Sequence, residues 1–142
     1  MGLITKVMED KKLKHLEFIQ QVISRMAGNL FYLRGWVITL IAGVLVLLTQ
    51  KDIGYFPFAF LILIIVIFWG YDAHFLSLER KYRCLYDKVR KMDEKDIDFS
   101  MSTDEFDVFK SNSIFFCAVS KTLMFFYGPI LLSAFYVVFF LK

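Results

Sequence analysis

Two apolar stretches separated by a short polar turn dominate the pattern of hydrophobic and polar positions. The first is Trp36–Leu48 and the second is Tyr55–Tyr71, with Thr49–Gly54 between them. A helix needs ~20 mostly apolar residues to cross the hydrocarbon core of a bilayer. Lipid offers no hydrogen-bond partner to an open backbone, so both segments should be helical. The pattern therefore predicts a transmembrane hairpin.

Helical periodicity continues upstream of the first apolar stretch. Apolar residues recur there at intervals of three and four, the spacing of a coiled-coil seam or a tight helix pair. The seam comprises Leu16, Ile19, Ile23, Met26, Leu30 and Leu33, and it continues formally through Val37, Leu40, Val44 and Leu47. It predicts one helix over residues 6–50, a coiled-coil-like cytoplasmic part that continues into transmembrane helix 1.

The second helix is also predicted to leave the membrane without a break. No Pro or Gly occurs from Tyr71 to Val89, so residues 55–91 should form transmembrane helix 2 and a cytoplasmic stalk. Its segment Phe58–Phe68 is apolar on all sides, which favours the lipid-exposed position in the hairpin.

The remainder of the chain completes an all-α polytopic membrane protein with three transmembrane helices, the first two extended into the cytoplasm. Residues 92–120 should form a cytoplasmic loop and an amphipathic helix, which Ser102 and Glu105 would begin as a capping box. Residues 121–142 supply a third apolar segment of adequate length.

Composition and charge support this topology. Of 142 residues, 58% are hydrophobic and 18% aromatic, which excludes an ordinary soluble domain. Lys and Arg are concentrated before residue 35 and within residues 72–121, whereas the turn has only Lys51 and the C-terminus only Lys142. Basic residues near membrane spans remain in the cytoplasm. The N-terminus is thus predicted inside and the C-terminus outside.

A second line of residues, polar or small, follows the first helix. At 100° per residue its members fall within roughly 40° of one line along the helix. They are Lys14, Gln21, Arg25, Gly28, Tyr32, Gly35, Thr39, Gly43, Val46 and Gln50, which we call the α-helical stripe. The Gly35, Thr39 and Gly43 spacing allows close helix approach, within one chain or between copies. Alternatively, the stripe lines a pore in a homo-oligomer, where Thr39 and Gln50 would contact water.

Ionisable residues supply two further candidate sites. Asp72 and His74 lie where the second helix leaves the membrane, a position at which function is suspected by default. Eight basic residues could either attract anionic lipid or bind a phosphate-rich ligand. They are Lys11, Lys12, Lys14, Arg80, Lys81, Arg83, Lys88 and Arg90.

Motifs for catalysis are absent from the sequence. It has no Gly-rich phosphate loop, no HExxH and no paired CxxC, and its two histidines, His15 and His74, lie at opposite ends of different helices. Cys84 and Cys117 are too few for a disulfide framework. We therefore expect no enzyme, metal site or cofactor.

Three segments together carry a resemblance: His15–Gly43, Phe68–Arg90 and Phe126–Ile130. They resemble small bacterial inner-membrane proteins of anti-phage defence loci, in particular the membrane effector of the Hailong system, which is paired with a cytoplasmic nucleotidyltransferase. The resemblance implies a homo-oligomer in the bacterial inner membrane that a short single-stranded DNA holds closed. Loss of that DNA would release a membrane-disrupting or ion-conducting state.

Two functions from different classes follow. The first is an oligomeric membrane effector of anti-phage defence, a pore or channel gated by a cytoplasmic nucleic-acid or nucleotide ligand. The alternative is a non-conducting membrane scaffold or regulatory subunit that anchors a cytoplasmic partner through its exposed helices.

Overall fold

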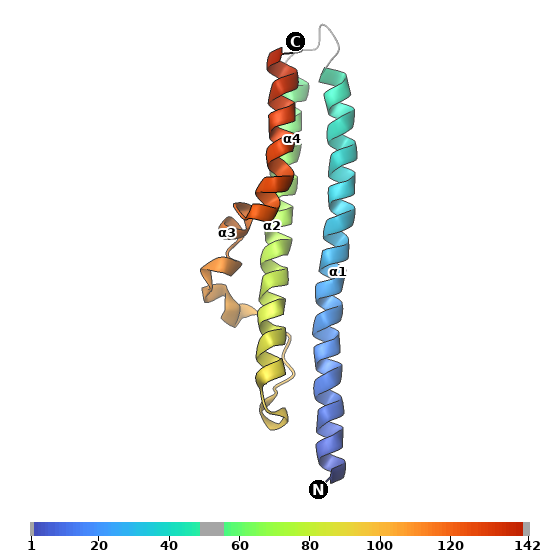
Figure 1. Ribbon diagram of the computed structural model, residues 1–142, viewed down its shortest axis with the longest axis vertical. Helices are drawn as coiled ribbons and strands as arrows, with labels where there is room; N and C mark the ends of the chain where they lie inside the picture. Colours follow the sequence, from blue (N-terminus) through green and yellow to red (C-terminus); the bar gives the residue numbers. More distant parts are fainter. Residues whose placement is uncertain (1, 49–55, 141–142) are drawn as a thin grey trace.

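Three long helices lie side by side and alternate in direction (Figure 1). They are α1 (Gly2–Leu48), α2 (Phe56–Lys91) and α4 (Lys121–Phe140). Short helical segments connect α2 to α4: η1 (Glu94–Asp96), η2 (Asp104–Val108), η3 (Lys110–Asn112) and α3 (Ile114–Ala118). This computed structural model describes the backbone of residues 2–48 and 56–140 and the side chains of 7–48, 56–137 and 139. The predicted all-α class is confirmed.

The predicted continuation of the first two helices beyond their apolar stretches is also confirmed. α1 has 47 residues and α2 has 36. At ~1.5 Å per residue these helices are roughly 70 Å and 54 Å long, well beyond the ~30 Å hydrocarbon core of a bilayer. By length and composition both could span a membrane, and α4 is a third, shorter apolar helix. Gln50 and the hairpin turn lie outside the described residues.

Two cores hold the helices together. We call the end of the molecule with α4 and the apolar stretches of α1 and α2 the apolar half, and the opposite end the charged half. The three-helix core holds the apolar half together. It comprises Val37, Ile41, Val44, Leu48, Leu61, Ile65, Ala73, Cys117, Leu123, Tyr127 and Ala134. The two-helix core joins α1, α2 and the connecting segment in the charged half; it comprises Ile19, Ile23, Leu85, Val89, Ile97 and Phe106. Burial of these side chains supplies the main stabilising force.

The seam of α1 is confirmed at five positions and is wrong at two positions near the C-terminal end of the helix. The seam residues Ile19, Ile23, Leu30, Val37 and Val44 are buried as predicted. Leu40 and Leu47, in contrast, are 41% and 49% exposed. Ile41 and Leu48 are buried in their place. A straight helix with 3.6 residues per turn drifts ~20° per heptad from a strict seven-residue repeat. The line of contact therefore moves to the following residue.

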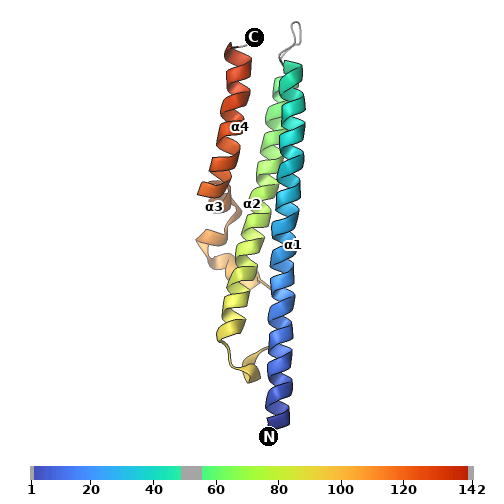
Figure 2. The same cartoon turned by 45° about the vertical axis from the view of Figure 1, so that its right-hand side comes forward.

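The prediction that α2 is the lipid-exposed helix is wrong. α2 packs against both α1 and α4, and it contributes Leu61, Ile64 and Ile65 to the buried residues (Figure 2). Its apolar character on all sides follows from this position, because two of its faces contact helices. Other apolar positions, such as Leu63, remain exposed.

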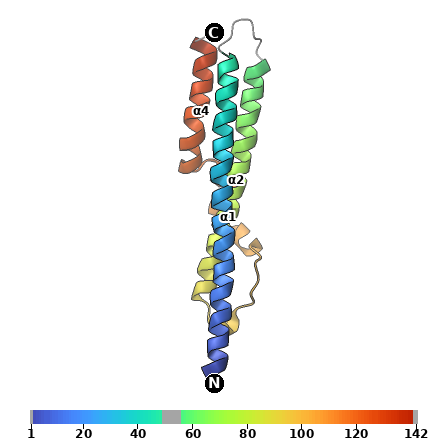
Figure 3. The ribbon, with the colours of Figure 1, turned by 90° about the vertical axis from the view of Figure 1, so that its right-hand side faces the viewer.

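The predicted loop over residues 92–103 is confirmed, apart from the single turn η1, whereas the amphipathic helix predicted after it is replaced by the short segments η2, η3 and α3. The segment runs back along the charged half of the α1–α2 pair (Figure 3). The capping box is wrong: η2 has no side-chain cap, and Glu105 instead accepts a hydrogen bond from Lys88 Nζ at 2.7 Å. Buried Asn112 donates to the Phe106 carbonyl at 3.0 Å. Hydrogen bonds of this kind favour short turns over the single continuous helix that was predicted for this segment.

Candidate functional site

A buried carboxylate joins the three long helices. Asp72 of α2 is 0% exposed and lies where the apolar half meets the charged half. Its Oδ2 atom accepts one hydrogen bond from Arg34 Nε of α1 at 2.9 Å and another from the Tyr127 hydroxyl of α4 at 3.1 Å. We call this cluster the Arg34–Asp72–Tyr127 junction.

Aromatic rings enclose the junction. Trp69 stacks on Tyr127 with ring centroids 5.5 Å apart, and its Nε1 donates to the Ala118 carbonyl at 2.9 Å. The Arg34 guanidinium lies 5.4 Å from the centroid of the Phe126 ring, within the range of a cation–π interaction. Such surroundings strengthen the ion pair and make an unpaired charge there costly.

The junction is connected to the α-helical stripe. Arg34 lines a groove of about 590 Å³ together with Tyr32, Gly35, Thr39 and Phe126. Asp72 Oδ1 has no hydrogen-bond partner among the described residues. A displacement of α1 would therefore change both the stripe and the pairing of a buried charge.

The sequence predicts Asp72 as a candidate functional residue, but it does not predict that Arg34 and Tyr127 are its partners. Arg34 and Tyr127 are 38 and 55 residues away from it along the chain. The signal in the sequence that could have indicated the ion pair is a basic residue just before the first apolar stretch and an acidic residue just after the second. His74, the other membrane-edge candidate, is not at the junction: it is exposed, and its ring packs against Phe75.

The middle of the α-helical stripe, from Tyr32 to Gly43, is exposed in the described part of the chain. Tyr32 is 70% exposed, and Gly35, Thr39 and Gly43 are exposed. A Cβ atom added at Gly28, Gly35 or Gly43 would meet no atom within 4 Å. Close packing of these glycines against the described helices of the same chain is therefore excluded, whereas packing between copies and pore lining stay predictions.

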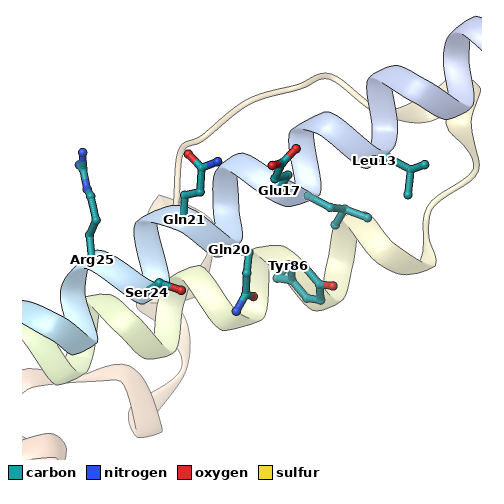
Figure 4. Close-up of a pocket in the computed structure, with 8 residues that line it drawn as sticks. Leu13, Glu17, Gln20, Gln21, Ser24, Arg25 and Tyr86 are labelled. Atoms are coloured by element: carbon teal, nitrogen blue, oxygen red, sulfur yellow. The ribbon is translucent and has the colours of Figure 1, made fainter.

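In the charged half, the same face of α1 is open. Gln21 and Arg25 of the stripe point away from α2, whereas Gln20 and Tyr86 lie where α1 and α2 meet (Figure 4). These residues line a groove of about 670 Å³. The uncovered face thus extends along α1 from the charged half into the apolar half.

The eight predicted ligand-binding basic residues do not form one free patch. Those of α2 bind groups of the same chain: Arg80 the Ser111 carbonyl, Lys81 Asp107, Arg83 Glu79, Lys88 Glu105 and Arg90 Asp87. Lys12 donates to the Met92 carbonyl at 2.7 Å. Lys11 and Lys14 have no ion pair among the described residues. Exposed pairs are worth only ~0–1 kcal/mol, so a polyanion could displace their acidic partners.

Cys117 should react with thiol reagents much more slowly than Cys84. Cys117 is buried in the three-helix core, whereas Cys84 is half-buried. Burial raises the pKa of the Cys117 thiol, and Arg80 and Lys81 only partly oppose this shift. At pH 8 the thiol stays protonated, and the thiolate is the reactive form. We expect the Cys84→Ser variant, which retains only Cys117, to be labelled at least ~10-fold more slowly than the Cys117→Ser variant, which retains only Cys84. Equal rates before denaturation would contradict the burial of Cys117, and equal rates in denaturant serve as the control.

No protein-family model matches this chain, and no curated protein or solved structure matches it. Within residues 7–48 and 56–139, no group of three or more His, Cys, Asp or Glu side chains could hold a metal ion. Functional interpretation therefore depends on the junction, the stripe and the cytoplasmic charges.

Proposed function

We propose that this chain is a subunit of a homo-oligomeric pore or channel in the bacterial inner membrane. α1, α2 and α4 would cross the bilayer, with the N-terminus and the charged half in the cytoplasm and the C-terminus outside. The assembly would act as an anti-phage effector gated by a cytoplasmic nucleic-acid or nucleotide ligand. A short single-stranded DNA made by a partner nucleotidyltransferase is the ligand that the sequence resemblance suggests.

The observation that carries the proposal is the exposure of Gly35, Thr39 and Gly43, the middle of the α-helical stripe. Thr39 and the bare backbone at Gly35 and Gly43 gain nothing from contact with lipid. Association of copies through α1 would either bury these positions between helices or turn them toward a water-filled passage. Because no described helix of the same chain packs on these three positions, a second copy of the chain is the partner that we propose for them.

The exposed apolar surface supports a membrane location. Trp36, Phe125 and Leu132 are 72%, 86% and 73% exposed. Soluble monomers rarely expose contiguous apolar patches larger than a few hundred Å². The first described turn of α1 and the last described turn of α4 lie at opposite ends of the molecule, as a topology with the two termini on opposite sides of the membrane requires (Figure 1).

The Arg34–Asp72–Tyr127 junction supports gating. It ties all three long helices to one carboxylate, and a rotation or shift of α1 would separate a buried charge from its partner. The junction would then have two discrete arrangements, paired and separated, as switching transitions require. A ligand on the charged half of α1 would bias it only by binding one arrangement more tightly.

A non-conducting membrane scaffold or regulatory subunit is the second candidate. This candidate is favoured because five of the predicted ligand-binding residues already bind groups of the same chain, so their charges are satisfied without a ligand. They are Arg80, Lys81, Arg83, Lys88 and Arg90. In that case the exposed face of α1 would anchor a cytoplasmic protein.

Ion flux through liposomes that contain the purified protein tests the proposal. We expect flux at least tenfold above that of protein-free liposomes, and suppression by short single-stranded DNA, because the ligand would stabilise the closed arrangement. Double-stranded DNA of equal charge is the control for non-specific attraction. If the liposomes show no ion flux above the protein-free control and the purified protein is monomeric, the channel proposal is overturned and the scaffold is favoured.

A further inference from the structure

A cavity of about 530 Å³ lies in the charged half, between α1 and the segment that follows η1. Its lining consists of Lys11, Lys14, His15, Phe18, Phe99 and Met101. The four residues from α1 are spaced three, one and three apart, so they share one face of the helix. The wall opposite comes from residues about 80 positions later in the chain, which explains why no sequence pattern revealed the cavity.

His15 supplies an unused polar group at this cavity. The residue is only 5% exposed, and its Nε2 atom is buried without a hydrogen-bond partner among the described residues. Buried polar groups are nearly always hydrogen-bonded, because an unpaired one loses its water without compensation. The ammonium groups of Lys11 and Lys14 share the cavity lining and have no ion pair in the described part of the chain.

Phe99 at this cavity has an unusual backbone conformation. Its φ is 56°, in the left-handed region that a bulky residue rarely adopts. The ring packs edge-on against His15 with centroids 5.5 Å apart. Phe18 and Phe99 nevertheless remain 50% and 39% exposed. Backbone strain persists where the surroundings require it, often at ligand clamps.

We infer that this cavity binds a small anion that carries a flat aromatic ring. The ring contacts Phe18 and Phe99, and the anionic group accepts hydrogen bonds from Lys11, Lys14 and His15. A nucleoside phosphate and an aromatic carboxylate share this chemistry. The consequence for gating depends on the function proposed above, whereas binding itself does not.

Equilibrium binding to the full chain in detergent micelles tests the inference. The probes are adenosine 5′-monophosphate and 2-naphthoate, with neutral adenosine and inorganic phosphate as controls. We expect at least one aromatic anion to bind at least tenfold more tightly than either control, and the one preferred identifies the phosphate or the carboxylate as the source. If neither binds, or if inorganic phosphate binds as tightly, the inference is overturned.

Two double variants locate the site. Lys11→Gln/Lys14→Gln should weaken binding at least tenfold. Lys91→Gln/Lys110→Gln removes the same charge from exposed lysines that do not line the cavity, and it should leave binding unchanged. Equal weakening by both would mean general attraction to a basic surface and would overturn the site. Phe18→Leu provides a further test: it retains all the charges and should still weaken binding severalfold.

Flux measured on the same preparations separates this inference from the proposed function. Binding without flux in liposomes would retain the site and overturn the channel. Flux without binding of either aromatic anion would retain the channel and overturn the site.

Discussion

Replacing Arg34 with methionine should lower the free energy of unfolding by about 3–5 kcal/mol. The substitution retains an unbranched side chain but leaves the Asp72 carboxylate, which is 0% exposed, with the Tyr127 hydroxyl as its one remaining hydrogen-bond partner among the described residues. A buried charge that loses its counter-charge keeps its desolvation penalty and loses the attraction that offset it.

The reverse substitution should be less damaging. Asp72→Leu leaves the Arg34 side chain, which is 26% exposed, so the guanidinium can still contact water. The double variant Arg34→Met/Asp72→Leu should recover part of the stability, because replacing both members of a buried pair by apolar groups is often close to neutral. The remaining loss, about 1–3 kcal/mol, would come from the buried Tyr127 hydroxyl, which loses its acceptor.

Unfolding in mixed micelles, followed by circular dichroism, measures these differences. The exposed pair Asp87–Arg90 is the matched control, since Asp87→Asn should change stability by less than ~1 kcal/mol. An Arg34→Met variant as stable as the original chain would contradict the junction. A double variant less stable than both single variants would contradict the offset between charge and desolvation.

The double variant Thr39→Leu/Gly43→Leu is expected to abolish assembly or conductance while leaving the single chain folded. A Cβ at Gly43 meets no atom of its own chain within 4 Å, and Thr39 is exposed with its hydroxyl bonded to the Gly35 carbonyl. Leucine at both positions would fill the space that close helix approach between copies requires, or would make a pore wall apolar.

Cross-linking in membranes and liposome flux measure this effect. We expect flux to fall at least tenfold in either case, and cross-linking to fall with it if the stripe packs between copies. Ala59→Leu is the control, because it enlarges an exposed small residue on α2 outside the stripe. Unchanged assembly and flux in the double variant would contradict an oligomeric role for the stripe. Loss of helix content in that variant would contradict the open space around α1.

Much of the fold was predictable because helices depend on local pattern. The apolar stretches Trp36–Leu48 and Tyr55–Tyr71, and the lack of Pro or Gly from Tyr71 to Val89, suffice to predict two long continuous helices. Asp72 was also identifiable, since a lone carboxylate beside an apolar stretch is unusual in any context. These features depend on residues close together in the chain.

Only the tertiary structure decided which surfaces meet. It paired Asp72 with Arg34 and Tyr127, and it paired Lys81 and Lys88 of α2 with acidic residues of the connecting segment. It also placed α2 against both neighbours, joined His15 to Phe99, and left Gly35, Thr39 and Gly43 exposed. These arrangements depend on residues far apart in the chain, whose pairing is determined by how helices pack and drift along one another. Periodicity identifies the faces of a helix, but the packing of several helices decides which face is covered.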